Sequence, residues 1–412
     1  MNGEDQPDYD VIIAGGGMIG ASLALALKPL NLKIAVVEAV ARTAELQPSF
    51  DDRSTALSRS TQRMFEAMGL WPGIESASTP IKHIHISDKG RFGFSHIDAE
   101  EQGVEALGYV VINRVLGGLL QASLDMLPRL DLLCPASIIA VNIDEARAEV
   151  MVDEGGHQSE LSCRLLVAAD GANSTVRDMI GISAKYVDYG QWAVIGNLLP
   201  QVRPANRAFE RFTEDGPVAM LPIADDRAAF VWMNSPDRAQ EILAVADNEF
   251  TAAIQSAFGY RLGHFSKVGR RVAYPLALTA AKGLISRRSV VVGNAAHGLH
   301  PVAAQGFNLG MRDVATLCDS IADTLAGDNN DIGCASLLES YADWRRADQV
   351  KLVRFTDSII NLFGDARGSM RTLRSLGMLG FDLVPGVRRM FAKHTMGLAG
   401  RLPRLSRGVP LE

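Results

Sequence analysis

The chain has 412 residues, 47% of them hydrophobic and 21% charged, so it is long enough for two domains that each bury a core. Its formal net charge of −6 argues against nucleic acid as the main partner, which would require a basic face. The four cysteines are scattered without a CxxC pair, which indicates reduced thiols and no metal site. The acidic first ten residues do not resemble a secretory signal, and no apolar run has the length of a membrane span, so we expect a cytoplasmic protein.

Residues 9–40 read as a strand, a glycine turn, a helix and a second strand, the pattern of a βαβ unit. Its glycines have GxGxxG spacing, which suits a tight turn, a close approach of the backbone to a pyrophosphate, and helix–strand packing. Glu38 ends the second strand, where it can accept hydrogen bonds from a ribose hydroxyl. The unit therefore predicts a bound dinucleotide, with contacts from Gly15, Gly17, Met18, Ile19, Gly20 and Glu38.

The rest of the chain predicts three further kinds of element: a strand that ends in a turn, a β-meander and a long helix. An apolar strand within 163–177 ends at Asp170 and Gly171 and is followed by a helix start. Short β-runs separated by turn signals between 207 and 233 favour an antiparallel meander. An apolar stripe predicts a long helix over 309–325.

These patterns predict a mixed α/β (α+β) fold, in which a Rossmann-like dinucleotide-binding domain carries an inserted antiparallel-sheet substrate domain and a helical C-terminus. The expected boundaries are 1–80, 100–180 and 285–340 for the first domain, 81–99 and 181–284 for the β-rich substrate domain, and 341–412 for the helical region.

Residues 290–310 read VVVGNAAHGLHPVAAQGFNLG. An apolar strand-like run is followed by a glycine-containing loop and then by the start of a helix. Together with GGGMIG (15–20) and VAADGANSTVR (167–177), this stretch resembles the flavoprotein aromatic hydroxylases, the group that includes para-hydroxybenzoate hydroxylase. The resemblance implies that the early motif holds the adenosine diphosphate half of FAD and the late motif holds its ribityl and flavin end. A helix that begins near 306–308 would direct its N-terminal partial positive charge at the flavin.

The segments FDDRSTALS (50–58), LGYVVINRVLGGLL (107–120) and AFERFTEDGPVAMLP (208–222) are most similar to the ubiquinone-biosynthesis branch of this group, and within it to the 2-polyprenyl-6-methoxyphenol hydroxylases. The similarity covers nearly the whole chain. It implies oxidation of a prenylated phenol to the 1,4-benzoquinol, with dioxygen and with NADPH or NADH docking transiently, since no second dinucleotide motif is present. Another ring position, a related FAD oxidoreductase such as a prenyl reductase or dehydrogenase, and a flavin-bearing assembly subunit without chemistry are the alternatives.

The resemblance also assigns roles to single residues. Arg53 matches an arginine that contacts the flavin-ribityl region, Arg114 a residue that flanks the cofactor, and Asp170 with Gly171 a motif near the pyrophosphate. Salt bridges for the arginines, and an ordinary turn for Asp170, are the alternatives. The late motif contributes Gly293, Asn294, Pro301, Gly306, Phe307 and Asn308.

The late motif departs from the family pattern at two positions. Asn294 stands where the wider group has an aspartate, and its amide still accepts and donates hydrogen bonds. Ala304 stands where the family has the first glycine of GQG, which puts a methyl group at a point of close backbone approach.

A phenol reacts with an electrophilic oxidant more readily after losing its proton, and its ordinary pKa is about 10. The site must therefore hydrogen-bond or partly deprotonate the substrate. His300 is the first candidate and His297 the second, because imidazoles titrate near neutrality. A structural role in the loop is the alternative for both, and a dedicated base is not required.

The C-terminal part of the chain is basic. Residues 366–412 contain nine Lys or Arg side chains and two acidic ones. The basic, partly apolar segment 387–405 suggests contact with the bilayer from which a prenylated substrate is drawn, or with a partner complex. Packing of these helices on the rest of the protein is the alternative.

Overall fold

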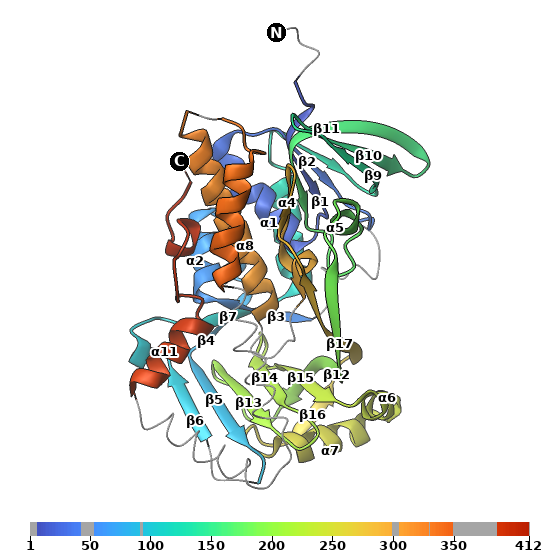
Figure 1. Ribbon diagram of the computed structural model, residues 1–412. Helices are drawn as coiled ribbons and strands as arrows, with labels where there is room; N and C mark the ends of the chain where they lie inside the picture. Colours follow the sequence, from blue (N-terminus) through green and yellow to red (C-terminus); the bar gives the residue numbers. More distant parts are fainter. Residues whose placement is uncertain are drawn as a thin grey trace.

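The computed structural model describes residues 6–42, 53–90, 94–298, 305–328, 330–348 and 385–411. Figure 1 shows an elongated molecule, with a helix-covered sheet at one end and a β-rich part at the other. The two long strands β12 and β17 run from the first part into the second. The mixed α/β fold class predicted from the sequence is confirmed.

The first sheet has its core in parallel strands. Its order is β18-β19-β11-β1-β2-β8, with β10 and β9 continuing antiparallel from β11. Val11, Ile12 and Ile13 of β1 are fully buried, as expected for a strand covered on both faces. The strands are β1 (Tyr9–Ala14), β2 (Ile34–Val37), β8 (Leu130–Leu133), β9 (Ser137–Ile143), β10 (Ala148–Glu154), β11 (His157–Ala168), β18 (Ile285–Ser286) and β19 (Ser289–Val291).

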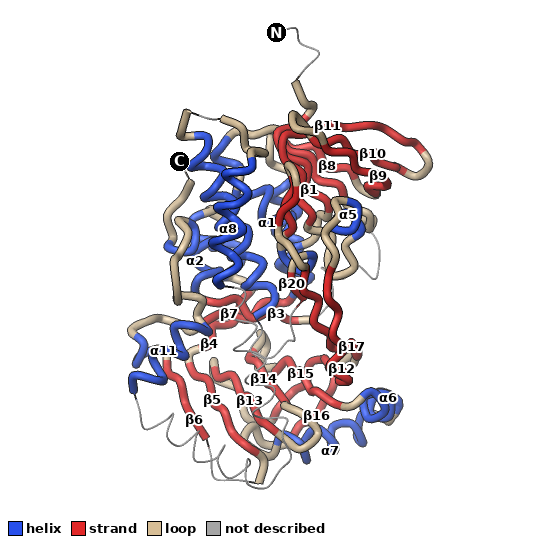
Figure 2. Tube along the Cα trace, in the orientation of Figure 1, coloured by secondary structure: helices blue, strands red, loops and turns tan. Residues whose placement is uncertain are grey.

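Helices cover this sheet (Figure 2). Helix α1 (Met18–Ala26) follows β1 directly, which confirms the predicted βαβ unit, and it packs against α4 (Asn113–Leu124) and α8 (Gln305–Leu325). Residues 335–348 are helical as well. The remaining helices of this part are α2 (Arg59–Ala67), α3 (Trp71–Glu75) and α5 (Thr175–Met179).

A small three-stranded sheet, ordered β3-β7-β4, lies between the two parts (Figure 1). Its strands are β3 (Ser54–Ser58), β7 (Gly108–Ile112) and β4 (Ser78–Ile81). The second large sheet has the order β20-β17-β12-β15-β14-β13-β5-β6, with β16 paired to β12. Its strands are β5 (His83–Asp88), β6 (Phe94–Asp98), β12 (Ala184–Pro200), β13 (Arg207–Phe212), β14 (Val218–Pro222), β15 (Ala228–Asn234), β16 (Phe265–Val268), β17 (Val272–Ala281) and β20 (His297–Gly298).

The second sheet has two apolar faces. Its outer face packs on α6 (Pro236–Ala244) and α7 (Asp247–Phe258), for example through Phe209 on Phe258. Its inner face, which includes Ala208 and Ala229, packs against Val110 of β7. The predicted meander is present, since β13, β14 and β15 pair antiparallel in sequence. The domain boundaries given above stay a proposal, and β5 and β6 lie in the second sheet.

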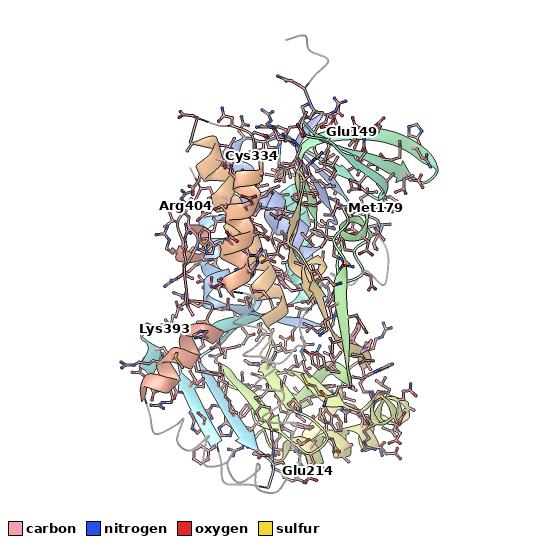
Figure 3. The ribbon with its side chains drawn as sticks, in the orientation of Figure 1. Glu149, Met179, Glu214, Cys334, Lys393 and Arg404 are labelled. Atoms are coloured by element: carbon pink, nitrogen blue, oxygen red, sulfur yellow. The ribbon has the colours of Figure 1, made fainter. Side chains whose placement is uncertain are left out.

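Helix α11 (Pro385–Thr395) packs beside β6, on the edge of the second sheet. Ala392 and Met396 are buried against Ile97 and Leu107. Lys393 projects from the other side of the helix (Figure 3). In the described residues, no helix combines the length and apolar character that crossing a bilayer would require.

Candidate functional site

The turn between β1 and α1 closes only because two of its residues lack a side chain. Gly15 has φ +98°, and a Cβ there would lie 2.6 Å from the carbonyl oxygen of Ala169. A Cβ on Gly20 would lie 1.9 Å from the carbonyl oxygen of Gly15. No side chain caps α1 at Gly17, so the N–H groups of its first turn are available to an anion such as a diphosphate.

Glu38 holds its carboxylate against this turn. Its two oxygens accept hydrogen bonds from the N–H groups of Gly16 at 2.6 Å and Val40 at 2.8 Å. The carboxylate is thus fixed at the carboxyl end of β2, beside the end of β1, where dinucleotides bind in doubly wound sheets.

We expect Glu38→Ala to weaken FAD binding by about 2 kcal/mol, roughly 30-fold, because a hydrogen bond to a charged group is lost. Titration of the apoprotein with FAD, followed by flavin fluorescence, measures this change. Glu154→Ala removes an exposed carboxylate at the end of β10 in the same sheet and should leave the affinity unchanged. Equal affinities for the two variants would contradict the ribose role of Glu38.

The side chain of Ile19, in the early glycine motif (15–20), contacts two glycines of the late motif and the helix that follows it. Gly293, with φ +60°, would place a Cβ 3.1 Å from Ile19, and Gly310 of α8 would place one 2.7 Å from it. Ile19 therefore fits between two glycines that are distant in sequence. This contact brings the start of α1 and the start of α8 into one site, as a single long cofactor requires.

A buried carboxylate organises the late motif. Asp313 of α8 accepts hydrogen bonds from the Gly293 N–H at 2.9 Å, from His297 Nε2 at 2.5 Å and from Arg345 Nε at 2.7 Å. The side chains of Asp313 and Arg345 are fully buried. Burial alone would raise the pKa of the Asp313 carboxyl, but His297, Arg345 and the N–H donor outweigh it and hold that pKa below its ordinary value.

The charge network continues away from the loop. Arg345 also pairs with Asp348 at 2.9 Å, and Arg312 pairs with Asp348 at 3.2 Å. The sequence does not distinguish Asp313 or Arg345, because each looks like one charge among many on a helix. Only the fold shows that both are buried together.

Asp170 lies next to the first glycine turn, since a Cβ on Gly15 would also lie 2.9 Å from the Asp170 Cα. Its carboxylate accepts hydrogen bonds from the Ser174 hydroxyl and from the Val176 N–H. These contacts fix the segment that leads into α5. Gly171 has φ +92°, which favours glycine. The proposed pyrophosphate role of this segment stays a prediction.

The first turn of α8 is tied to β3 and α2 by Asn308. Its amide donates to the carbonyl of Ala56 and accepts from the Ser58 N–H and the Thr61 hydroxyl, at 2.7–2.8 Å. Among the described residues, none has an atom within 4 Å of where a Cβ on Gly306 would lie. Phe307 is half-buried there. Cofactor contacts from these residues remain predicted.

The two arginines lie in different surroundings. The Arg53 guanidinium lies 4.7 Å over the ring of Tyr274 on β17, at the junction of the two parts. Arg114 is exposed on the first turn of α4. Asn294 is also exposed, beside the buried Gly293.

The histidine predictions have different outcomes. His300, like Pro301 and Ala304, lies outside the described residues. His297 is buried and paired with Asp313, and its role in proton transfer stays a prediction. No group of His, Cys, Asp and Glu in the described ranges could hold a metal ion.

Glycine turns and an anchored carboxylate thus meet at the carboxyl ends of β1, β2 and β19, and the late loop adjoins them. This arrangement fits the two ends of FAD, and it defines a dinucleotide-binding flavoprotein. A model of the FAD binding domain family matches residues 8–356. The chain belongs to this family and, within it, to the FAD-dependent hydroxylases of ubiquinone biosynthesis.

Curated relatives span almost the same length. The chain is 35% identical over 408 residues to "Ubiquinone hydroxylase UbiL" of Rhodospirillum rubrum, covering 98% of this chain and 93% of that protein. It is 29% identical to "3-demethoxyubiquinol 3-hydroxylase" of Escherichia coli, covering 94% and 98%. A crystal structure of p-nitrophenol 4-monooxygenase PnpA from Pseudomonas putida has the same fold, with a TM-score of 0.79, 17% identity, and 95% and 98% coverage. The protein is an FAD-dependent monooxygenase that uses dioxygen.

Proposed function

We propose that the protein hydroxylates the ring of a polyprenylated phenol in ubiquinone biosynthesis, converting 2-polyprenyl-6-methoxyphenol to the 1,4-benzoquinol. The reaction consumes NADPH or NADH and one dioxygen. A ring C–H becomes C–OH with one oxygen atom, and the other oxygen leaves as water with the two electrons of the nicotinamide. The observation that supports it best is the full-length similarity to ubiquinone hydroxylases at up to 35% identity.

The residues present suit FAD, which when bound and reduced supplies the activation of dioxygen. In our proposal, the N–H groups at the start of α1 bind the diphosphate, and Glu38 binds the adenosine ribose. The loop at Gly293 and the first turn of α8 receive the ribityl and flavin end, held in shape by Asp313. Arg53 adds a cation at the junction with the second sheet, where it orients anionic oxygens.

The apolar inner face of the second sheet suits the prenylated ring. Ala193, Met233 and Leu276 form a buried apolar group there. Tyr274, which contacts Arg53, lies two residues before Leu276 on β17 and so shares its face. We therefore place the substrate between this face and the start of α8.

The ring position is the part of this proposal that relatives leave open, since one of them is named as a 3-hydroxylase. Purified FAD-loaded protein is incubated with NADPH and a short-tailed 2-prenyl-6-methoxyphenol, and the product is analysed by mass spectrometry with fragmentation. We expect one added oxygen para to the phenol hydroxyl. Oxygen at another carbon would reassign the position, and a product with two added hydrogens would support a prenyl reductase instead.

We also propose that the exposed side of α11 contacts an anionic bilayer or a partner complex, so that the enzyme works peripherally at a membrane. Arg389, Met390 and Lys393 are exposed there, whereas Arg388 pairs with Glu101 at 3.4 Å. A basic surface with an apolar side chain suits phospholipid headgroups.

Charge reversal of Arg389 and Lys393 to Glu should remove at least about 2 kcal/mol of attraction, lowering binding roughly 30-fold. Co-sedimentation with vesicles that contain anionic phospholipid measures the binding. Lys185→Glu with Lys267→Glu, two exposed lysines of the second sheet, makes the same charge change elsewhere. A similar loss in both double variants would show that net charge, and not α11, governs the binding.

A further inference from the structure

The inner face of the second sheet carries a carboxyl among apolar side chains. Glu210 lies in β13, next to Phe209, which packs on Phe258 at the outer face. Side chains alternate along a strand, so Glu210 shares the inner face with Ala208. Ala208 packs against Val110 of β7, in the cluster that joins the second sheet to the three-stranded sheet. Glu210 therefore faces the junction between the two parts of the molecule.

Nothing in the described part of the chain pairs with this carboxyl. The strand neighbours of Glu210 are Ile86 on β5 and Ala219 on β14, neither of which can donate a side-chain hydrogen bond. Glu210 is half-buried as a residue, and its carboxyl lies on the buried side. Burial alone raises its pKa to about 7. A carboxyl without a partner is costly, and such groups gather at functional sites.

The other titratable groups of this face leave Glu210 unperturbed. By the same alternation they include Asp88 at the end of β5, Tyr274 on β17 and Lys267 on β16. Arg53 lies over the Tyr274 ring. On the neighbouring strands β14 and β15, the described sequence has no charged side chain. No charged group contributes to the raised pKa of Glu210.

An apolar surface with one proton acceptor matches a phenol that carries a long apolar substituent. An ordinary glutamate, with a pKa of about 4.3, is a weak base toward a phenol of pKa about 10. A glutamate with a pKa of about 7 is better matched to both the phenol and the working pH. Glu210 thus combines a position on the inner face with basicity.

We propose that Glu210 is the catalytic group that binds and ionises the phenol hydroxyl of the substrate. Its carboxylate accepts the phenolic proton, which leaves a phenolate and a neutral Glu210 side chain. The electron pair released from the O–H bond raises the electron density of the ring carbons ortho and para to oxygen, and the acid later returns the proton to the product. The assignment rests on the proposed function, since it requires a phenolic substrate.

Glu210→Gln keeps the shape of the side chain and removes the proton acceptor. With short-tailed 2-prenyl-6-methoxyphenol we expect kcat/KM to fall by about 100-fold or more. In the wild type kcat/KM should rise with pH through about 7, because the carboxylate is the active form, and this rising limb should disappear in the variant. Glu214→Gln, at an exposed position in the turn after β13 (Figure 3), is the matched control and should behave as wild type.

Two measurements are independent of turnover. The ultraviolet difference spectrum of the same phenol, bound without NADPH, should show phenolate with wild-type protein above pH 7 and neutral phenol with Glu210→Gln. Since the folded pKa lies above the unfolded value of about 4.3, the folded state holds the proton more tightly, and wild-type stability is lost as pH rises to 7. The variant should therefore gain in Tm over wild type at pH 8 and not at pH 4.

The outcomes separate this assignment from the proposed function. A wild type that hydroxylates the phenol, together with an equally active Glu210→Gln whose pH profile is unchanged, overturns the role of Glu210 alone. A wild type that forms no oxygenated product defeats the proposed function, and the difference spectrum then still decides whether Glu210 ionises a bound phenol. Neutral phenol bound to the wild type at pH 8, or no bound phenol at all, overturns the assignment.

Discussion

Replacing Arg345 by Met is expected to lower the free energy of unfolding by about 3–5 kcal/mol, because it leaves buried charge without its partner. Arg345 is fully buried and pairs with both Asp313 and Asp348. Asp313 in turn holds the N–H of Gly293, so the loop that receives the flavin end should lose its shape as well. Denaturant unfolding measures the stability, and the ratio of bound flavin to protein measures the site.

The adjacent residue provides the control. Arg346 is 70% exposed and pairs with Asp343 at 3.4 Å on the surface. Arg346→Met should change stability by less than about 1 kcal/mol and leave flavin content unchanged. Equal stability losses in the two variants would contradict the organising role of the Asp313 network.

Gly20→Ala is expected to cost about 3 kcal/mol or more and to abolish FAD binding. The added methyl carbon would lie 1.9 Å from the carbonyl oxygen of Gly15, so α1 must move away from β1. The movement displaces the N–H groups that we assign to the diphosphate. Thermal unfolding and FAD titration of the apoprotein report the two effects separately.

Gly118→Ala makes the same chemical change in an open place. Gly118 is exposed within α4, and a Cβ there would meet no atom of the described residues within 4 Å. Since alanine favours the helix, this variant should gain up to about 1 kcal/mol and bind FAD normally. If Gly20→Ala bound FAD as tightly as Gly118→Ala, the close-packed turn would not be the diphosphate site.

Local patterns predicted the fold correctly where neighbouring residues determine it. The βαβ unit follows from its glycine spacing and apolar strands, and the meander from its short β-runs and turns. The long helix was predicted over 309–325, and the structure begins it at Gln305 and ends it at Leu325.

Contacts between distant residues were harder to predict. Asp313 and Arg345 are 32 positions apart, and no periodicity distinguishes them from surface charges. The fit of Ile19 between Gly293 and Gly310 also depends on how two helices meet. These contacts depend on the tertiary structure, because the sheet determines where α1 and α8 lie relative to each other.

The position of Glu210 could not be predicted for a different reason. In AFERF (208–212) the two phenylalanines and the two charged residues do not alternate regularly. The sequence pattern therefore does not show which face of the sheet carries Glu210. The packing of Phe209 on α7 decides it. The sequence alone points to histidines as proton acceptors, because the ordinary pKa of an imidazole is near neutrality. In Glu210, burial raises the pKa of a carboxyl to about 7.

The most direct test of the proposed chemistry is the origin of the new oxygen atom. FAD-loaded protein is given NADPH, a short-tailed 2-prenyl-6-methoxyphenol and isotopically heavy dioxygen in ordinary water, and the product is weighed by mass spectrometry. We predict one heavy oxygen on the ring for each NADPH consumed in coupled turnover. A product whose added oxygen is light, or substrate converted without any added oxygen, would contradict a monooxygenase acting on this phenol.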